Sequence, residues 1–222
     1  MATGYDDAGH RGLAGPGRSR LEIKKSQFLG WVEPVTTARA AAAVLAARRK
    51  AHYDARHHCA ASILGPQGDQ QRSNDDGEPA GSAGAPMLAA LRQAQVSDVV
   101  AVVSRYFGGV KLGFGPLTRA YAQAVREALA DAPQVVWRPV ARLAARAPHA
   151  TAGDFEHALR RWLAARGGHL DEVAHDAEAV ALTMAVELDD AAAGADFLAG
   201  WAARGVSWTA LGPARRARPA GP

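Results

Sequence analysis

The order of the hydrophobic patterns after Pro133 is the feature that most constrains the fold. The apolar period there alternates between about two and about 3.6 residues, so strands and helices can be assigned in turn. The order strand, helix, strand, strand, helix, strand is the ferredoxin-like or split βαβ arrangement, here within about 75 residues. The segments are a strand from Val135, a helix from Thr151 ending at Gly167 and Gly168, strands around Val173 and over 180–186, a helix over 190–205 and the strand "VSWTAL".

A different pattern precedes Pro133 and indicates a second domain. The chain has 222 residues, more than the roughly 100–200 over which one core usually grows. We therefore expect an α+β protein with an N-terminal domain over 19–132 and a smaller ferredoxin-like βαββαβ domain over 134–211. Residues 1–18 are polar and Gly-rich, and residues 212–222 are rich in Pro, Gly and Arg. Both segments are predicted to be disordered.

The N-terminal domain is also expected to mix strands and helices. A strand pair over 20–35 leads into a helix capped by Thr36 or Thr37, and "ARHHCAASIL" is predicted to be a strand. Two further helices should open at Pro86 and Pro116, with the buried strand "DVVAVVSRYFGG" between them. The second of these helices has an apolar face at helical spacing, made of Leu117, Tyr121, Ala124, Val125 and Ala128.

Charge and cysteine content limit the functions that this chain can have. Its net charge of +4 comes from 26 basic and 22 acidic residues, with Arg far more frequent than Lys. That balance favours an anionic partner, although a GC-rich genome encodes the same composition. The single cysteine, Cys59, excludes an intramolecular disulfide and a multi-cysteine metal site. The sequence has neither an apolar leader nor about 18 consecutive apolar residues, so we expect a cytoplasmic protein without a membrane partner.

Three acidic residues lie in a segment that has no hydrophobic period. Residues 65–84 are predicted to form a long loop, which in a compact domain is usually functional or disordered. Asp75, Asp76 and Glu78 are candidates for a Mg²⁺ site or a general acid/base pair. Alternatively, their side chains cap backbone N–H groups or pair with arginines, and the loop is structural. The remaining residues of this motif loop are Gly77, Pro79, Gly81, Ser82 and Gly84.

A second Gly-rich segment, "SRYFGGVKLGFGPLTRAY", connects a buried strand to a helix N-terminus. Free N–H groups and the helix dipole favour an anion in such a place, and Arg105, Lys111 and Arg119 flank it. The segment matches neither phosphate-loop pattern, so the sequence does not support a nucleoside triphosphatase or a dinucleotide-binding protein. The alternative is a tight crossover loop that needs glycine for packing. The candidate anion or RNA site also includes Gly108, Gly109, Gly113 and Gly115.

The sequence does not support a metal centre or a nucleophile at "HHC". On a strand, His57 and Cys59 share one face and His58 points to the other, so only two ligands converge where a structural zinc needs four. A small buried thiol is also more common than a reactive one. The C-terminal Trp162, Trp201 and Trp208 are predicted to be core residues.

Four motifs in this order closely resemble the YigZ/IMPACT family (UPF0029), and the C-terminal part is similar to the DUF1949 domain of bacterial members. The motifs are "SQF", "DARHHCAA", "SNDDGEPAGSAGAPML" and "VVSRYFGGVKLGFGPLTRAY", and the resemblance covers about residues 20–211.

The resemblance implies an N-terminal domain of the ribosomal protein S5 domain 2-like fold. It also implies that both domains are similar to the fourth and fifth domains of the translocating elongation factor. Eukaryotic relatives regulate translation through a starvation kinase, but with an extra N-terminal domain that this sequence lacks, so that role is not carried over. Two departures concern the motifs themselves. Residues 113–116, Gly-Phe-Gly-Pro, stand where the family has a Gly-Thr-Gly-Gly-like run, and Pro116 lacks the backbone N–H that another residue would have there. Ser82 stands where Thr is more common in the family.

We therefore expect a protein that binds RNA or the ribosome, is associated with translation regulation, has no DNA sequence specificity, and does not catalyse a reaction. No catalytic nucleophile, base and orienting group can be assembled from the sequence, and no cofactor is expected. The alternative is a Mg²⁺-dependent nucleotide-binding protein or small-molecule enzyme that uses the motif loop at residues 75–84, which we call the acidic loop. A protein-interaction module is a third possibility.

Overall fold

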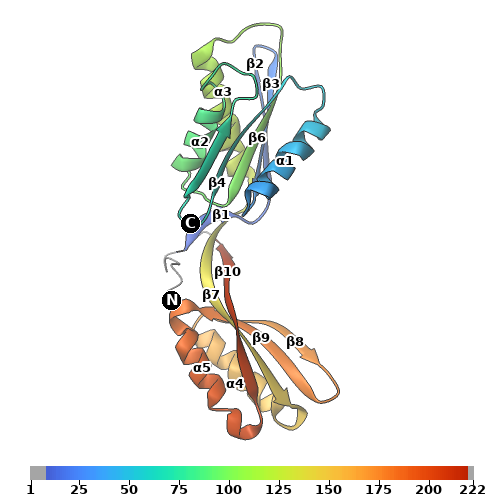
Figure 1. Ribbon diagram of the computed structural model, residues 1–222, viewed down its shortest axis with the longest axis vertical. Coiled ribbons are helices and arrows are strands. Elements are labelled where there is room, and N and C mark those ends of the chain that lie inside the picture. The colour runs from blue at the N-terminus through green and yellow to red at the C-terminus, as the bar shows by residue number, and fades with distance from the viewer. Residues whose placement is uncertain (1–8, 220–222) are drawn as a thin grey trace. The chain divides into compact units, whose positions relative to one another are not determined.

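Two structural units, each with its own apolar core, make up the chain (Figure 1). The computed structural model describes residues 9–219. The main segments of the two units are His10–Val136 and Trp137–Arg216. The division falls inside strand β7 (Gln134–Pro148), shortly after the change of hydrophobic pattern at Pro133.

The first unit is built on a five-stranded antiparallel sheet with the strand order β2-β3-β6-β4-β5. In β3, every second residue from Ser26 to Val32 is buried and the residues between them are half-buried, which is the period of a strand with one face in the core. The strands are β2 (Gly17–Ile23), β3 (Ser26–Pro34), β4 (His57–Leu64), β5 (Gln70–Asn74) and β6 (Val99–Tyr106).

Helices cover both faces of this sheet (Figure 1). Helices α2 (Gly84–Gln93) and α3 (Phe114–Asp131) enclose the main core on one face, and α1 (Ala38–Ala51) lies over a smaller cluster on the other. The Thr37 hydroxyl caps α1 by accepting a hydrogen bond from the Ala40 N–H, as predicted. The predicted apolar face of α3 is confirmed, because all five of its residues are buried.

The α3 helix begins at Phe114, two residues before the predicted start. Proline is tolerated throughout the first turn of a helix, so Pro116 does not mark the first position by itself. Arg119 therefore lies in the second turn, where the helix dipole has less effect on a cation than in the first.

Three segments predicted to be irregular form strands. Within residues 1–18, β1 (His10–Leu13) is a strand, and the Leu13 side chain is fully buried in the core. The predicted loop over 65–84 contains β5, an exposed edge strand whose polar residues give no apolar period. The prediction that residues 212–222 are disordered is also wrong for residues 212–219, because they belong to strand β10 (Ser207–Pro219). Residues 1–8 and 220–222 lie outside the described residues.

The second unit has the predicted order β-α-β-β-α-β, with β10, β7, β9 and β8 adjacent in that order, and β1 also pairs with β7. Trp162 and Trp201 pack against its core as expected, whereas Trp208 is 38% exposed in β10 and is not a core residue. No helix in the described chain is long and apolar enough to span a bilayer. The other elements are α4 (His149–Ala165), β8 (His169–His175), β9 (Ala179–Glu187), α5 (Ala191–Ala199) and the short 3-10 turns Leu188–Asp190 and Ala202–Arg204.

Candidate functional site

The carboxylate of Asp75 closes the acidic loop onto the start of α2. Oδ1 accepts hydrogen bonds from the N–H groups of Ala83 and Gly84 at 3.0 and 2.7 Å, and Oδ2 accepts one from Gly81 at 2.8 Å. Burial raises the pKa of Asp75, but the three N–H donors outweigh it and the pKa is lowered from its ordinary value. Asp75 therefore acts as a helix cap supplied from outside the helix, as the structural interpretation of the loop predicts.

Asp76 connects the same loop to β4 and α1. Its Oδ2 accepts a hydrogen bond from the His58 N–H at 2.7 Å, and its Oδ1 pairs with Arg49. Asp76 has a positive φ of 44°, as has Gly77 at 82°, so this tight turn uses residue types that tolerate the left-handed region. Arg49 lies on α1 and was not among the predicted partners.

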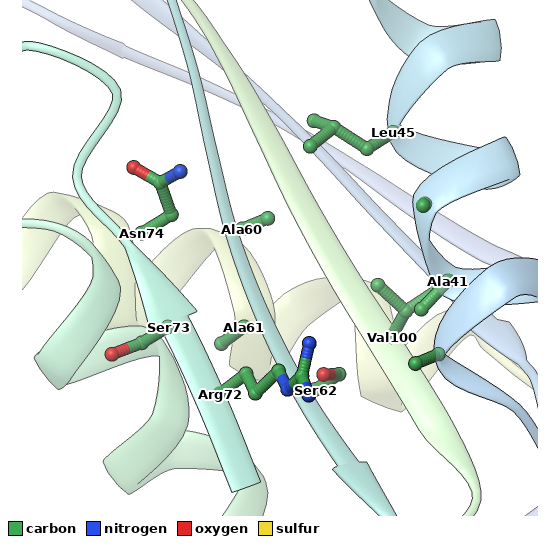
Figure 2. A pocket seen from close by; sticks show the side chains of 11 residues that line it. Ala41, Leu45, Ala60, Ala61, Ser62, Arg72, Ser73, Asn74 and Val100 are labelled. Atoms are coloured by element: carbon green, nitrogen blue, oxygen red, sulfur yellow. The ribbon is translucent and has the colours of Figure 1, made fainter.

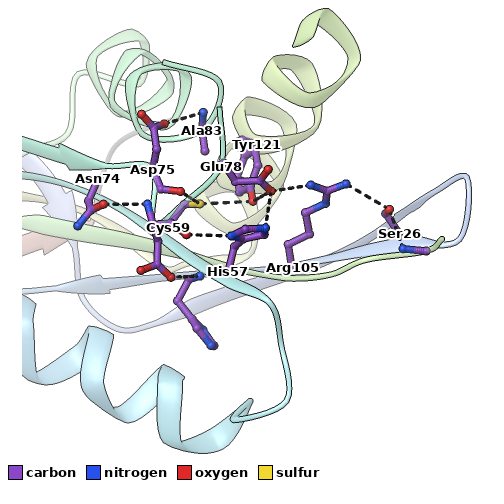
Figure 3. A network of polar contacts seen from close by, with 12 residues as sticks. Ser26, His57, Cys59, Asn74, Asp75, Glu78, Ala83, Arg105 and Tyr121 are labelled. Atoms are coloured by element: carbon purple, nitrogen blue, oxygen red, sulfur yellow. Dashed lines mark hydrogen bonds and ion pairs between the residues drawn. The ribbon is translucent and has the colours of Figure 1, made fainter. Parts of the chain in front are cut away.

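Glu78 lies at the centre of a buried polar network (Figure 3). Its Oε1 accepts hydrogen bonds from Arg105 Nη1 at 2.6 Å and from the Tyr121 hydroxyl at 2.7 Å. The side chains of Glu78 and Arg105 are only 3% and 6% exposed. Arg105 is thus neutralised by a predicted partner, but its Nε–H has no hydrogen-bond acceptor among the described residues.

Cys59 and Tyr121 complete the apolar side of this network. The Cys59 thiol is buried, and its Sγ donates to the Asp75 carbonyl oxygen at 3.0 Å. Burial raises the pKa of Cys59 to about 12, and burial also raises the pKa of Tyr121. Because only a thiolate is an effective nucleophile, Cys59 is a core residue and not a reactive group.

His57 and His58 point to opposite faces of β4, as predicted. His58 Nδ1 lies 2.9 Å from the Ser104 hydroxyl, whereas His57 Nδ1 lies 2.8 Å from the Asp76 carbonyl oxygen. A carbonyl oxygen can only accept, so His57 Nδ1 carries the proton and, in the neutral ring, Nε2 is an acceptor. Among residues 9–219, no group of three or more His, Cys, Asp or Glu side chains could hold a metal ion.

The part of the Gly-rich segment between β6 and α3, residues 107–113, with the start of α3 as far as Gly115 is called the glycine loop, and it packs closely against the turn that joins β2 to β3. A Cβ at Gly108 would collide with the backbone of Lys25 and Ser26, so only glycine fits there. The Gly108 N–H also donates to the buried Ser26 hydroxyl at 3.1 Å. Two lysines, Lys24 and Lys25, therefore lie beside the glycine loop, although they are more than 80 residues away in sequence.

A pocket of about 370 Å³ opens between the acidic loop and the glycine loop. Polar and charged side chains on its wall come from both loops and from β4, and two exposed aromatic rings, Phe107 and Phe114, lie at its edge. The lining residues are Arg56, His57, Gly77, Glu78, Pro79, Arg105, Phe107, Lys111, Leu112, Gly113, Phe114 and Leu117.

The structure separates the predicted site residues into three groups. Lys111, Gly113, Arg105, Gly77, Glu78 and Pro79 line the pocket. Asp75, Asp76, Gly81, Ser82, Gly84 and Gly108 do not line the pocket but take part in hydrogen bonds that hold the two loops in place. Gly109, Gly115 and Arg119 do not line it; Gly109 and Arg119 are exposed and Gly115 is half-exposed.

Sequence reasoning did not assign six residues of the pocket wall to the site, nor the lysine turn; the six are Arg56, His57, Phe107, Leu112, Phe114 and Leu117. Phe107 and Phe114 flank the glycines in sequence, so an apolar ring on each side of a polar loop was a usable signal. Arg56 directly precedes the "HHC" motif and stacks 5.7 Å from the Phe107 ring centre. His57 was considered only as a metal ligand. Lys24 and Lys25 gave no signal, because their position depends on the sheet topology.

A second pocket, of about 300 Å³, lies between α1 and the edge strand β5 (Figure 2). Its wall is made mainly of small side chains, such as Ala41 on α1 and Ala60 on β4, and Arg72 is its one charged lining residue. A wall of this kind offers little to orient a polar ligand.

Similar proteins are known for both units. The sequence profile of the Impact N-terminal domain matches residues 24–129. The IMPACT family member YvyE of Bacillus subtilis is 43% identical over 113 residues, which are 51% of this chain and 52% of that protein, so the match spans about half its length. The "IMPACT family member in pol 5'region" of Thermus thermophilus is 40% identical over 151 residues, 68% of this chain and 81% of that protein. A crystal structure of a hypothetical protein is 32% identical, with a TM-score of 0.63, and covers 92% of this chain and 98% of its own.

Proposed function

Because the chain belongs to the IMPACT family, we propose that it binds RNA, free or in the ribosome, in a non-catalytic role connected with translation. The observation that carries this proposal is the pocket of about 370 Å³ between the two motif loops, with Lys111 and Arg56 in its wall. The resemblance of both domains to parts of an elongation factor supports the connection with translation. A protein partner and a cytoplasmic location stay predictions from the sequence.

The electrostatics of the pocket favour a phosphate group. Glu78 neutralises Arg105, whereas Lys111 and Arg56 have no ion-pair partner in the described chain. Helix α3 adds its N-terminus, since Gly113 provides no side-chain cap and the first turn has no acidic residue. Unpaired N–H groups and two cations around one hollow attract an anion, and RNA supplies phosphates in a row.

The salt dependence of RNA binding tests this proposal. Each phosphate contact contributes roughly 0.7–0.9 to the slope of log affinity against log salt concentration. In fluorescence anisotropy with a labelled RNA, we expect Lys111→Ala to weaken binding and reduce the slope by about one, with little dependence on RNA sequence.

Arg126→Ala is the matched control, because Arg126 is exposed on α3 but away from the pocket lining. It should leave the slope nearly unchanged. A wild-type protein that bound no RNA, or a Lys111→Ala variant with the wild-type affinity and slope, would contradict the proposal.

A free nucleotide, with or without Mg²⁺, is the second candidate ligand. The volume of the pocket favours it, because single small-molecule sites are typically about 300–1,000 Å³. The acidic side chains already bind protein donors, so Mg²⁺ would have to arrive with the phosphates. Calorimetry with mononucleotides, with and without Mg²⁺, distinguishes this ligand from RNA.

A further inference from the structure

Exposed apolar side chains gather on the glycine loop. Six large apolar side chains are exposed among the described residues, and three of them lie within eight residues: Phe107 at 41%, Val110 at 52% and Phe114 at 58%. Both phenylalanines line the pocket. Neither aromatic ring belongs to a core cluster, so their positions suit a planar ligand that stacks on them.

Phe107 is prepared for such stacking by the charges around it. The guanidinium carbons of Arg56 and Arg105 each lie 5.7 Å from the centre of its ring. Because Glu78 already neutralises Arg105, it is the Arg56 guanidinium beside this ring that attracts the phosphate of a nucleotide whose base lies on the ring. The pocket wall thus combines an apolar surface with cationic groups.

The turn between β2 and β3 adds cations outside the pocket. Ile23 pairs with Ser26, so Lys24 and Lys25 alone form the turn, with φ angles of 48° and 65°. Such a turn normally uses Asn-Gly or similar residues, because other side chains are strained at positive φ. Both lysines are exposed, and the backbone of Lys25 contacts Gly108, next to Phe107. Of the four lysines in the chain, only Lys50 lies elsewhere.

We propose that the pocket takes one unpaired nucleotide of an RNA chain, while the flanking phosphates cross the Lys24–Lys25 turn. The base stacks on Phe107 or Phe114, and its phosphate lies near Lys111 and Arg56. A base in a duplex has both faces covered by its neighbours, so only a bulged, looped or terminal base can enter. The recognised RNA is therefore one with an extrahelical nucleotide. This inference rests on the proposed function.

Two RNAs of equal length and charge provide the first test. One is a blunt-ended duplex with a single bulged adenosine, and the other carries an abasic residue in the same bulge, so neither RNA contains any other unpaired base. Stacking of one base on an aromatic ring should make the adenosine bulge bind roughly ten-fold more tightly in fluorescence anisotropy.

Substitution of the rings should remove this preference. Phe107→Leu/Phe114→Leu keeps apolar side chains at both positions but loses the flat rings, and we expect it to bind both RNAs alike with the wild-type salt slope. Tyr53→Leu is the control, because Tyr53 is an aromatic residue that is 86% exposed away from the pocket lining. It should keep the ten-fold preference.

The lysine turn distinguishes an RNA chain from a free nucleotide. Lys24→Asn/Lys25→Gly removes both charges and gives the turn the Asn-Gly sequence that two-residue hairpin turns prefer, so we expect this variant to fold normally. We expect this variant to lower the salt slope for the bulged RNA by about two and to leave binding of adenosine monophosphate unchanged. Arg39→Ala/Lys50→Ala removes two exposed cations from α1 instead and should leave both measurements near the wild type.

The results separate this inference from the proposed function. Equal affinity for the two bulged RNAs overturns the inference, whereas a flatter slope for Lys111→Ala would still support RNA binding. If Lys24→Asn/Lys25→Gly keeps the wild-type salt slope for the bulged RNA and the protein binds adenosine monophosphate, the pocket is a site for a free nucleotide. That result also overturns the inference. Absence of RNA binding by the wild type overturns both proposals.

Discussion

At Glu78, one carboxylate oxygen serves two buried donors. Arg105 Nη1 and the Tyr121 hydroxyl both reach Oε1, at 2.6 and 2.7 Å. Inside a protein each of these groups would be costly alone, because charges and hydroxyls lose their hydration there. Together they satisfy one another and fix the acidic loop against β6 and α3.

Removal of the Glu78 charge should therefore be strongly destabilising. Glu78→Gln leaves the Arg105 guanidinium buried without a counter-ion, and we expect a loss of about 3–5 kcal/mol in the free energy of unfolding. Urea denaturation followed by circular dichroism measures this.

Two further variants identify the source of that loss. Tyr121→Phe removes the hydrogen bond from the Tyr121 hydroxyl to the Glu78 carboxylate but keeps the ion pair, and should cost about 1.5–3 kcal/mol. Glu127→Gln changes an exposed carboxylate on α3 and should stay within about 0.5 kcal/mol of the wild type. Equal losses for Glu78→Gln and Tyr121→Phe would show that the ion pair adds no stability beyond a hydrogen bond.

At this scale the sequence allowed the observed kind of contact but indicated only some of its members. For Asp75, Asp76 and Glu78 the sequence left two interpretations, a Mg²⁺ or acid/base site and a structural loop of caps and ion pairs, and the observed contacts are those of the second. The pairing of Glu78 with Arg105 follows from that interpretation. Arg49 and Tyr121 could not be chosen from the sequence, because many arginines and hydroxyls were equally available until the strands were placed.

At the scale of elements, Asp75 is the link between the acidic loop and α2. The helix has no cap from its own N-cap residue, Ala83, so the first N–H groups depend on the Asp75 carboxylate. The pKa of Asp75 is lowered in the folded state. Its contribution to stability is therefore complete above the unfolded pKa and is lost as the pH falls through the lower, folded pKa.

The stability difference between the wild type and Asp75→Asn should follow this titration. We expect about 1–3 kcal/mol at pH 7, and a difference that begins to shrink once the pH falls below the ordinary value of 3.8. Urea denaturation of both proteins over a series of pH values measures it, and the other carboxylates cancel in the comparison. A difference that did not change with pH would mean that loop geometry, and not the charge of Asp75, accounts for the loss.

Elements with a strong apolar period were predictable, and those without one were not. The buried face of α3 repeats at 3.6 residues, so its residues were identified correctly. Strand β5 has five exposed polar residues, because it pairs with β4 alone at the sheet edge. Strand β1 has only four residues and lies among glycines, so it shows no apolar period and the sequence did not identify Leu13 as a core residue. The contact between Gly108 and the lysine turn depends on which strands are neighbours, which no local pattern specifies.

At the scale of the whole molecule, each unit encloses its own core, and this raises the question of what each needs to fold. The change of pattern at Pro133 predicted independent folding of residues 19–132. The structure adds β1 to the first unit: Leu13 is fully buried in the core, and the Ala14 N–H donates to the Pro133 carbonyl oxygen at 2.8 Å. A fragment that begins at residue 19 loses both contacts.

We expect residues 10–136 to fold alone, and residues 19–132 to be less stable by several kcal/mol. Loss of a buried Leu side chain costs about 2–5 kcal/mol by itself, and the shorter fragment also loses the first residues of β2. Urea denaturation of both fragments, followed by circular dichroism, gives the difference in the free energy of unfolding.

Leu13→Ala in the fragment 10–136 isolates the contribution of that side chain. Because the backbone of β1 is kept, this variant should lie between the two fragments, about 2–5 kcal/mol below the unsubstituted one. Fragments of equal stability would mean that the core closes without β1, and the boundary at residue 19 would then be correct. If 10–136 were unfolded, the first unit would need the remainder of the chain, and the two units would not be independent domains.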